Sequence, residues 1–90
     1  MQVLITGATG GIGFAIATEF AQAGHQVILA DLQQSAIDNK VAELNAQGFT
    51  AAGLQLDVTD AAAVDALSAQ YQIDVLVNNA GITRDTLLMR

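Results

Sequence analysis

The sequence predicts an α/β fold in which a parallel, doubly wound sheet carries helices on both faces. Along all 90 residues, short apolar runs alternate with segments whose apolar residues recur at helical spacing. The first two runs show no polar alternation, which is typical of central strands buried on both sides. Because parallel strands are joined by right-handed helical crossovers, we expect a βαβαβαβ order of elements and the spatial strand order 3-2-1-4.

The first half of the chain predicts two strand–helix units. Residues 3–5 and 27–30 are short apolar runs, as expected for buried strands. Each is followed by a helical pattern that ends at a glycine, Gly24 in the first unit and Gly48 in the second. The apolar faces of the two helices are expected to consist of Ile12, Ile16 and Phe20, with Ala17 and Ala21 alongside, and of Ile37, Val41 and Leu44.

The second half predicts two more strands and a helix between them. Residues 54–58 alternate apolar and polar side chains, so we expect a third strand with one exposed face. Thr59-Asp60 predicts the start of a third helix, because a capping residue and an acidic residue in the first turn both stabilise a helix. Residues 73–77 predict the fourth strand, which ends at Asn78-Asn79.

Composition narrows the range of partners. With 52% hydrophobic and 13% charged residues, the chain is expected to form a packed core. The net charge is −6, and basic residues occur only at Lys40, Arg84 and Arg90, which argues against nucleic acid and anionic membrane surfaces as partners. The absence of cysteine excludes disulfides and thiolate metal ligands. The sequence shows neither a signal peptide nor a membrane-spanning run, so a cytoplasmic location is expected.

A glycine-rich segment between the first strand and the first helix predicts a phosphate-binding loop. Gly7 would permit the tight turn, while Gly11 and Gly13 would let the backbone approach a pyrophosphate and let the helix pack on the sheet. Free N–H groups and the positive end of the helix would then bind the phosphates. The segment contains no lysine, which excludes a mononucleotide P-loop. The alternative is a glycine-rich turn that binds no ligand.

Asp31 stands at the end of the second predicted strand, the usual place for a carboxylate that accepts hydrogen bonds from an adenosine ribose. A hydrogen bond to a charged group contributes about 1.5–3 kcal/mol. A 2′-phosphate would instead meet a like charge, a repulsion of about 1–4 kcal/mol at about 4 Å. No basic residue follows nearby, so we expect NAD(H) to be favoured over NADP(H). The alternative is an aspartate that only makes a turn at the strand end.

The loop pattern Thr-Gly-x-x-x-Gly-x-Gly resembles that of the short-chain dehydrogenase/reductase family. Asn78-Asn79-Ala80-Gly81 resembles the family's second signature and favours its compact branch over the sugar-epimerase-like branch. Residues 81–90 resemble the segment that follows in 3-oxoacyl-[acyl-carrier-protein] reductases and acetoacetyl-CoA reductases. The resemblance implies a truncated Rossmann-type sheet, with residues 1–90 forming a single dinucleotide-binding domain.

The resemblance also implies which residues line the cofactor. Asp57 and Val58 would contact the amino group and the face of the adenine, or would alternatively belong to a helix N-cap. Asn78 would hold the strand ends together, and the residues after it would line the adenosine. The expected cofactor-binding residues are Gly7, Thr9, Gly10, Gly11, Ile12, Gly13, Asp31, Leu32, Asp57, Val58, Asn79, Ala80 and Gly81.

The chemistry implied by the resemblance is reduction of a carbonyl by hydride transfer, with a 3-oxoacyl thioester of fatty acid biosynthesis as substrate. The family's catalytic Ser, Tyr-x-x-x-Lys pair and helix-borne Asn are expected beyond this chain. Tyr71 cannot replace that tyrosine, because Val75 stands where the lysine is needed. We therefore expect no catalytic residue, no metal site and no turnover by these residues alone. The alternatives are a stand-alone dinucleotide-binding or self-assembling module and a folding fragment.

The fourth predicted strand is also a candidate interface. Val75, Leu76 and Val77 would form an apolar strand at the edge of the sheet. Unpaired edges of this kind pair readily with another chain. We therefore expect either a homo-oligomer or a complementary C-terminal segment to pair there.

Overall fold

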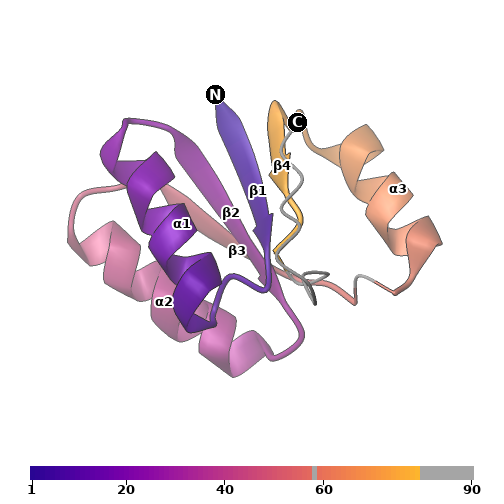
Figure 1. Ribbon diagram of the computed structural model, residues 1–90, viewed down its shortest axis with the longest axis horizontal. Helices are drawn as coiled ribbons and strands as arrows, with labels where there is room; N and C mark the ends of the chain where they lie inside the picture. Colours follow the sequence, from indigo (N-terminus) through magenta and orange to yellow (C-terminus); the bar gives the residue numbers. More distant parts are fainter. Residues whose placement is uncertain (58, 80–90) are drawn as a thin grey trace.

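The computed structural model describes residues 1–57 and 59–79, and these form a four-stranded parallel sheet with three helices (Figure 1). The strand order is β3-β2-β1-β4, which confirms the predicted order and the predicted α/β class. The elements are β1 (Gln2–Thr6), α1 (Gly11–Gln22), β2 (Gln26–Asp31), α2 (Gln34–Ala46), β3 (Ala51–Gln55), α3 (Ala61–Gln70) and β4 (Val75–Val77).

The sheet separates two apolar layers. Helices α1 and α2 lie on one side of it and α3 lies on the other (Figure 1). Successive residues of β1 and β2 alternate between the layers: Val3 and Ile5 pack in the layer of α1 and α2, whereas Leu4 packs in the layer of α3. Both faces of the central strands are therefore buried, which explains why these strands show no polar alternation in the sequence.

The buried face of α1 consists of small residues. Gly13, Ala17 and Ala21 are buried against the sheet, and Ile16 and Phe20 are only half-buried. Ile12 was expected in the same face but is 72% exposed. Small side chains let the helix axis approach the strands closely, so the larger residues are displaced to the flanks of the contact. Ile12 lies in the first turn of α1, beside the loop that leads into the helix.

The third strand begins earlier than its alternating pattern predicts. It spans Ala51–Gln55 and pairs in parallel with β2, with Ala51 opposite Val27 and Gln55 opposite Asp31. A Cβ atom on Gly53 would collide with the side chain of Ile37, so this glycine lets α2 pack tightly on the strand. Pairing with β2 and contact with α2 fix the position of β3, and neither is visible in a local hydrophobic pattern.

The third helix starts close to the predicted position, but its cap is Asp60 rather than Thr59, and its first turn has no acidic residue. Asp60 is its N-cap, and the Asp60 side chain accepts a hydrogen bond from the backbone N–H of Ala63 at 3.2 Å. The fourth strand is tied to the first by Asp74. The Asp74 carboxylate accepts a hydrogen bond from the backbone N–H of Gln2 at 2.8 Å, and the Asp74 N–H donates to the Gln2 carbonyl at 2.9 Å.

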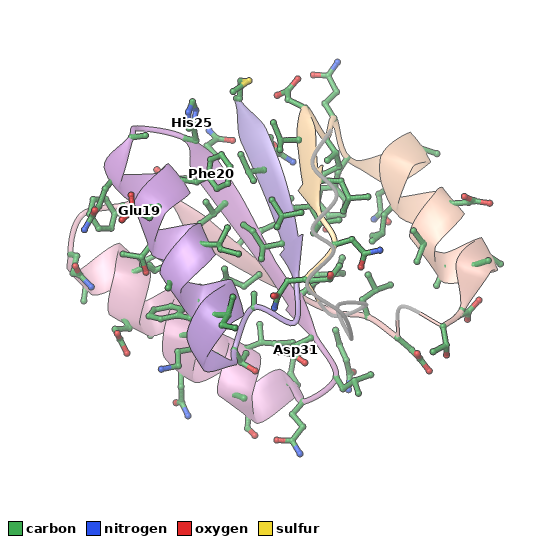
Figure 2. The ribbon with its side chains drawn as sticks, viewed as in Figure 1. Glu19, Phe20, His25 and Asp31 are labelled. Atoms are coloured by element: carbon green, nitrogen blue, oxygen red, sulfur yellow. The ribbon has the colours of Figure 1, made fainter. Side chains whose placement is uncertain are left out.

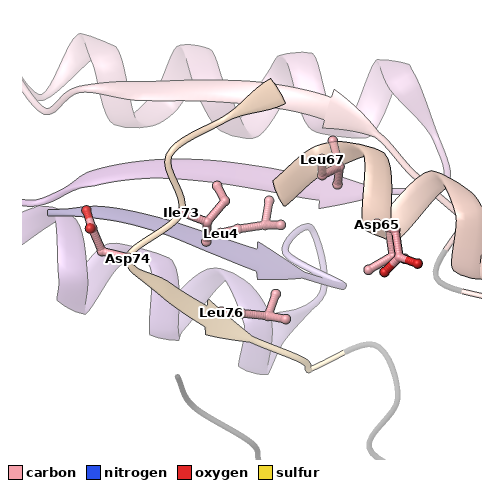
Figure 3. A pocket seen from close by; sticks show the side chains of 7 residues that line it. Leu4, Asp65, Leu67, Ile73, Asp74 and Leu76 are labelled. Carbon is pink, nitrogen blue, oxygen red and sulfur yellow. The ribbon is translucent and has the colours of Figure 1, made fainter. Parts of the chain in front are cut away.

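The layer of α3 is incompletely filled. A cavity of about 490 Å³ lies between α3 and the strands β1 and β4 (Figure 3). Its lining is mainly apolar, with two carboxylates, and consists of Leu4, Val64, Asp65, Leu67, Ile73, Asp74 and Leu76. We call this the α3 groove. Within the described part of the chain, no helix has the length and apolar character needed to cross a membrane.

Candidate functional site

The glycine-rich loop leaves the carboxyl end of β1 and enters α1 through one tight turn. Gly7 has a φ of 61°, a left-handed conformation that favours glycine. The N–H of Ala8 donates to the carbonyl of Ala30 at 3.2 Å, which ties the loop to β2. The N–H of Gly10 donates back to the carbonyl of Gly7 at 3.4 Å. The turn predicted at Gly7 is therefore present.

Gly13 is the point of closest packing in this loop. A Cβ atom there would overlap the carbonyl oxygen of Gly7 and lie 2.7 Å from Nδ2 of Asn79. The Asn79 amide also donates a hydrogen bond to that same Gly7 carbonyl, at 3.1 Å. Gly11 is different, because a Cβ atom on it would meet no atom of the described residues within 4 Å. One side of the loop is thus packed against protein, while the side at Gly11 is open.

The start of α1 suits an anionic ligand. Gly10 is the N-cap and provides no side-chain hydrogen bond, and the first turn contains no acidic residue. The first N–H groups of a helix have no partner within the helix, and they point outward at the positive end of its dipole. Backbone N–H groups in this arrangement bind phosphate without a lysine.

Asp31, the last residue of β2, faces this loop (Figure 2). Its Oδ2 accepts hydrogen bonds from the Thr9 N–H at 3.0 Å and from the Thr9 hydroxyl at 2.6 Å. Its Oδ1 accepts from the Leu32 N–H at 2.8 Å. Partial burial raises the pKa of the Asp31 carboxyl, but the bonds from Thr9 and then Leu32 outweigh that effect and hold the pKa below its ordinary value.

Asp57 lies two residues beyond the end of β3 and is exposed. Its Oδ1 accepts hydrogen bonds from the hydroxyl and the N–H of Thr59, at 2.6 and 2.9 Å, which lower the pKa of the carboxyl. In a parallel sheet, the carboxyl ends of all strands lie at one edge. Asp57 follows β3 and therefore lies at the same edge as Asp31 and Asn79. Its contact with adenine stays a prediction. Val58, Ala80 and Gly81 lie outside the described residues.

Several supporting residues were not predicted. Gln55 donates its side-chain amide to the carbonyl of Leu32 at 2.8 Å and so braces the chain just after Asp31. The buried Thr6 hydroxyl donates to the Asn78 side chain at 3.2 Å, which confirms the structural role expected of Asn78. A polar side chain at the end of a strand, beside a predicted loop, is the signal that would have pointed to Gln55.

Two apolar side chains stand open at the same edge. Ile12 is 72% exposed and Leu32 is 59% exposed, although both are large and hydrophobic. Exposed apolar side chains beside polar binding groups are typical of a ligand site. Both residues were predicted to contact the cofactor, and their exposure leaves them free to do so.

The single histidine and the single tyrosine lie away from the loop. His25 packs on Phe20 with their ring centroids 6.0 Å apart, far from Asp31 (Figure 2). Tyr71 follows α3 and packs in the layer of that helix. Within residues 1–57 and 59–79, no three His, Asp or Glu side chains gather closely enough to hold a metal ion.

A parallel sheet of order 3-2-1-4, with a glycine-rich turn after β1 and a carboxylate after β2, defines a Rossmann-type dinucleotide-binding protein. Comparison with known families narrows this class of proteins to a single family. Residues 1–89 match the family described as short chain dehydrogenase, and the chain belongs to that family.

Curated relatives place the chain near one group of reductases. A 3-oxoacyl-[acyl-carrier-protein] reductase of Synechocystis sp. is 48% identical over 93 residues, covering 97% of this chain and 38% of that protein. The uncharacterized oxidoreductase YxjF of Bacillus subtilis is 48% identical over 84 residues, covering 88% and 33%. The predicted resemblance is confirmed, and the chain spans about a third of the length of these curated relatives.

Solved structures give the same fold. A short-chain dehydrogenase from Sphingobium yanoikuyae in complex with NADPH has a TM-score of 0.79 at 34% identity, covering 94% of this chain and 35% of that one. A variant of actinorhodin polyketide ketoreductase with NADPH has a TM-score of 0.77 at 36% identity, covering 90% and 33%.

The predicted preference for NAD(H) over NADP(H) is wrong. The two structural neighbours just described are complexes with NADPH. The prediction treated Asp31 as a free charge, whereas three donors already bond its carboxylate. In addition, α2 begins at Gln34, three residues later, and its first turn has no acidic residue. The positive end of that helix offsets part of the carboxylate charge.

Proposed function

We propose that this chain is the NADP(H)-binding part of a short-chain reductase that acts on a carbonyl, with 3-oxoacyl thioesters as the substrate class. The observation that carries the proposal is the loop itself, open at Gly11 and packed at Gly13 against Gly7 and Asn79. The 48% identity to a 3-oxoacyl-[acyl-carrier-protein] reductase supports the proposed substrate class. When bound, the nicotinamide supplies the hydride that reduces the carbonyl to a hydroxyl.

The described residues suit the successive parts of a dinucleotide. The backbone N–H groups of Gly11 and Ile12 would bind the pyrophosphate at the start of α1. Asp31 and Leu32 would lie beside the adenosine ribose, with Asp57 near the adenine. A 2′-phosphate would be placed next to the first turn of α2, where unpaired N–H groups and the helix dipole favour an anion.

The role proposed for these residues is binding and orientation of the cofactor. The chain has a single tyrosine, Tyr71, and it packs in the layer of α3 rather than at the loop. Proton transfer to the carbonyl oxygen is therefore assigned to residues other than those described here. The whole protein's turnover would require those residues to be supplied beside the loop.

A substitution at Gly11 is expected to change NADPH binding without changing the stability of the fold. We expect Gly11→Glu to weaken NADPH binding at least about tenfold, because a carboxylate would stand where the pyrophosphate is expected. Stability should not fall, since a Cβ atom at Gly11 meets nothing within 4 Å among the described residues and an acidic residue suits the first turn of a helix. Calorimetric titration with NADPH and urea unfolding measure the two quantities.

The matched control is Gln22→Glu, which adds the same charge at the exposed far end of α1. It should bind NADPH as the parent chain does. Equal NADPH affinities for Gly11→Glu and the parent would contradict the placement of the pyrophosphate. A folded parent chain that does not bind NADPH at millimolar concentration would contradict the proposed function.

We also propose that β4 pairs with a further strand, either from a second copy or from a complementary segment. Within the described residues, β4 pairs only with β1, so its other edge offers unpaired backbone groups. The α3 groove lies beside this strand and is mainly apolar. Native mass spectrometry tests the proposal. We expect a dimer or a complex with a second polypeptide, and a strictly monomeric chain at micromolar concentration would argue against it.

A further inference from the structure

The strand β4 is short and is held to its neighbours at both ends. It consists of Val75–Val77, and its pairing with β1 covers these three positions. Asp74 lies at its amino end (Figure 3), where the carboxylate accepts a hydrogen bond from the Gln2 N–H at 2.8 Å. At the carboxyl end, the Asn79 amide donates to the Gly7 carbonyl at 3.1 Å. Three residues provide little pairing by themselves, so we expect these end contacts to determine how firmly β4 is held.

The contact at the carboxyl end involves the phosphate loop itself. The Gly7 carbonyl that accepts from Asn79 also accepts from the Gly10 N–H, at 3.4 Å. The Asn79 amide nitrogen would lie 2.7 Å from a Cβ atom on Gly13, so it packs against the first turn of α1. A displacement of β4 would move Asn79 with it. That side of the loop would then lose both its packing and its hydrogen bond.

The layer beneath β4 is incompletely filled. The α3 groove lies against this strand and has a volume of about 490 Å³, with Leu76 among its lining residues. Val75 and Leu76 are half-buried, whereas Val77 is fully buried. Elements with few buried apolar contacts open locally at a lower free-energy cost than the rest of a domain. We therefore expect the position of β4 to respond to the loss of a single end contact.

We propose that Asp74 is a remote positioning residue for NADPH binding: it holds β4 at one end, and Asn79 transmits that position to the phosphate loop at the other. The two residues are separated by on the order of 15 Å, at about 3.3 Å per residue of extended chain. The inference rests on the proposed function, since NADPH is the ligand proposed for the loop. A partner strand on the outer edge of β4 would hold β4 in the same way. It would strengthen NADPH binding and, by reciprocity, would itself bind more tightly when NADPH is present.

The test is a double-mutant cycle on NADPH affinity in the parent chain, Asp74→Ala, Asn79→Ala and the double variant. We expect Asp74→Ala to weaken NADPH binding about fivefold, although Asp74 lies at the opposite edge of the sheet from the loop. In the Asn79→Ala background the same change should have almost no effect, because the link to Gly7 is already lost. The four proteins are compared where circular dichroism shows each to be at least about nine-tenths folded, so global unfolding cannot account for a fivefold change.

The matched control is Asn45→Ala. The Asn45 side chain holds the first residue of the other edge strand, β3, by accepting from the Ala51 N–H at 2.9 Å and donating to the Ala51 carbonyl at 3.2 Å. In the sheet, β2 lies between β3 and β1. The control should lower stability but leave NADPH affinity within about twofold of the parent value. If it weakens NADPH binding as much as Asp74→Ala does, the effect of Asp74 is a general loss of stability and the inference is wrong.

A second measurement needs no cofactor. The Phe14 N–H donates to the Gly10 carbonyl at 2.8 Å, at the start of α1, and its hydrogen exchange followed by NMR reports opening at the loop. We expect exchange about fivefold faster in Asp74→Ala and in Asn79→Ala, and unchanged in the control. If Asp74→Ala does not fold, Asp74→Asn weakens the same bond less severely, because a neutral amide is a weaker acceptor than a carboxylate.

The outcomes separate this inference from the proposed function. If the parent binds NADPH and Asp74→Ala binds it equally well, the remote role of Asp74 is wrong and the proposed function stands. The same conclusion follows if the effects of Asp74→Ala and Asn79→Ala are additive. An unchanged exchange rate of Phe14 in Asp74→Ala would overturn the inference without reference to any cofactor. A parent chain that does not bind NADPH would overturn the proposed function and, with it, the role of Asp74 in binding.

Discussion

Gly13→Ala is expected to lower the free energy of unfolding by about 3 kcal/mol, at the upper end of the usual cost of overpacking. The added Cβ would overlap the carbonyl oxygen of Gly7 and lie 2.9 Å from the Gly7 carbonyl carbon. Those atoms are backbone, and Gly7 is held in a left-handed turn, so they cannot move aside cheaply. Urea unfolding followed by circular dichroism measures the loss.

The matched control for this change is Gly11→Ala, two residues earlier in the same helix. Within the part of the chain that the structure describes, a Cβ atom at Gly11 meets nothing within 4 Å, so no packing cost is expected. Alanine is favoured over glycine in a helix by about 0.5–1 kcal/mol, and stability should be equal or slightly higher. Equal unfolding free energies for Gly13→Ala and the parent chain would show that the loop does not pack on α1 as described.

Leu29→Ala is expected to lower the free energy of unfolding by about 2–5 kcal/mol, the range for truncating a buried leucine. Leu29 is 0% exposed at the centre of β2, in the layer that α1 and α2 cover. A domain of this size is stable by only about 5–10 kcal/mol, so the variant should be partly unfolded at moderate temperature. Thermal and urea unfolding both measure the change.

The control for this substitution is Leu32→Ala, three residues further along. Leu32 is 59% exposed, and removal of its side chain leaves no cavity in the core. Its effect on stability should stay within about 0.5 kcal/mol, as for most surface changes. If Leu29→Ala and Leu32→Ala lowered the free energy of unfolding by similar amounts, the assignment of Leu29 to the core would be contradicted.

The parts of the fold that depend on local pattern were predicted from the sequence. The strands around Ile5 and Leu29 are continuous apolar runs because both faces of the sheet are covered, and such runs are recognisable without a structure. The start of α3 at Asp60 follows from capping chemistry, which involves only a few adjacent residues. The strand order follows from the handedness of the crossovers.

The parts that depend on packing between distant segments were predicted less well. The strand β3 is displaced toward Ala51, because pairing with β2 fixes its position more strongly than its own side chains do. The exposure of Ile12 was missed for a related reason, since the small residues at Gly13 and Ala17 bring α1 too close to the sheet for a larger side chain to lie between them.

The error in the cofactor has an electrostatic origin. A sequence shows that Asp31 carries a charge, but it does not show which donors bond to that carboxylate in the fold. The hydroxyl of Thr9 and the N–H groups of Thr9 and Leu32 are invisible as partners until the loop and the strand end are placed together. The presence of a glycine-rich loop, in contrast, is predicted directly by the spacing of its glycines.

The hydrogen bond from Asn79 to Gly7 also predicts an order of events during folding. The loop is short and its residues are neighbours in sequence, yet its last bond spans 72 residues. Contacts of such high sequence separation carry a large loop-closure entropy and form late. We therefore expect the loop to reach its final geometry only after β4 has docked on β1. Anion binding at α1 is then a reporter of completed folding, rather than of the first strand–helix unit alone.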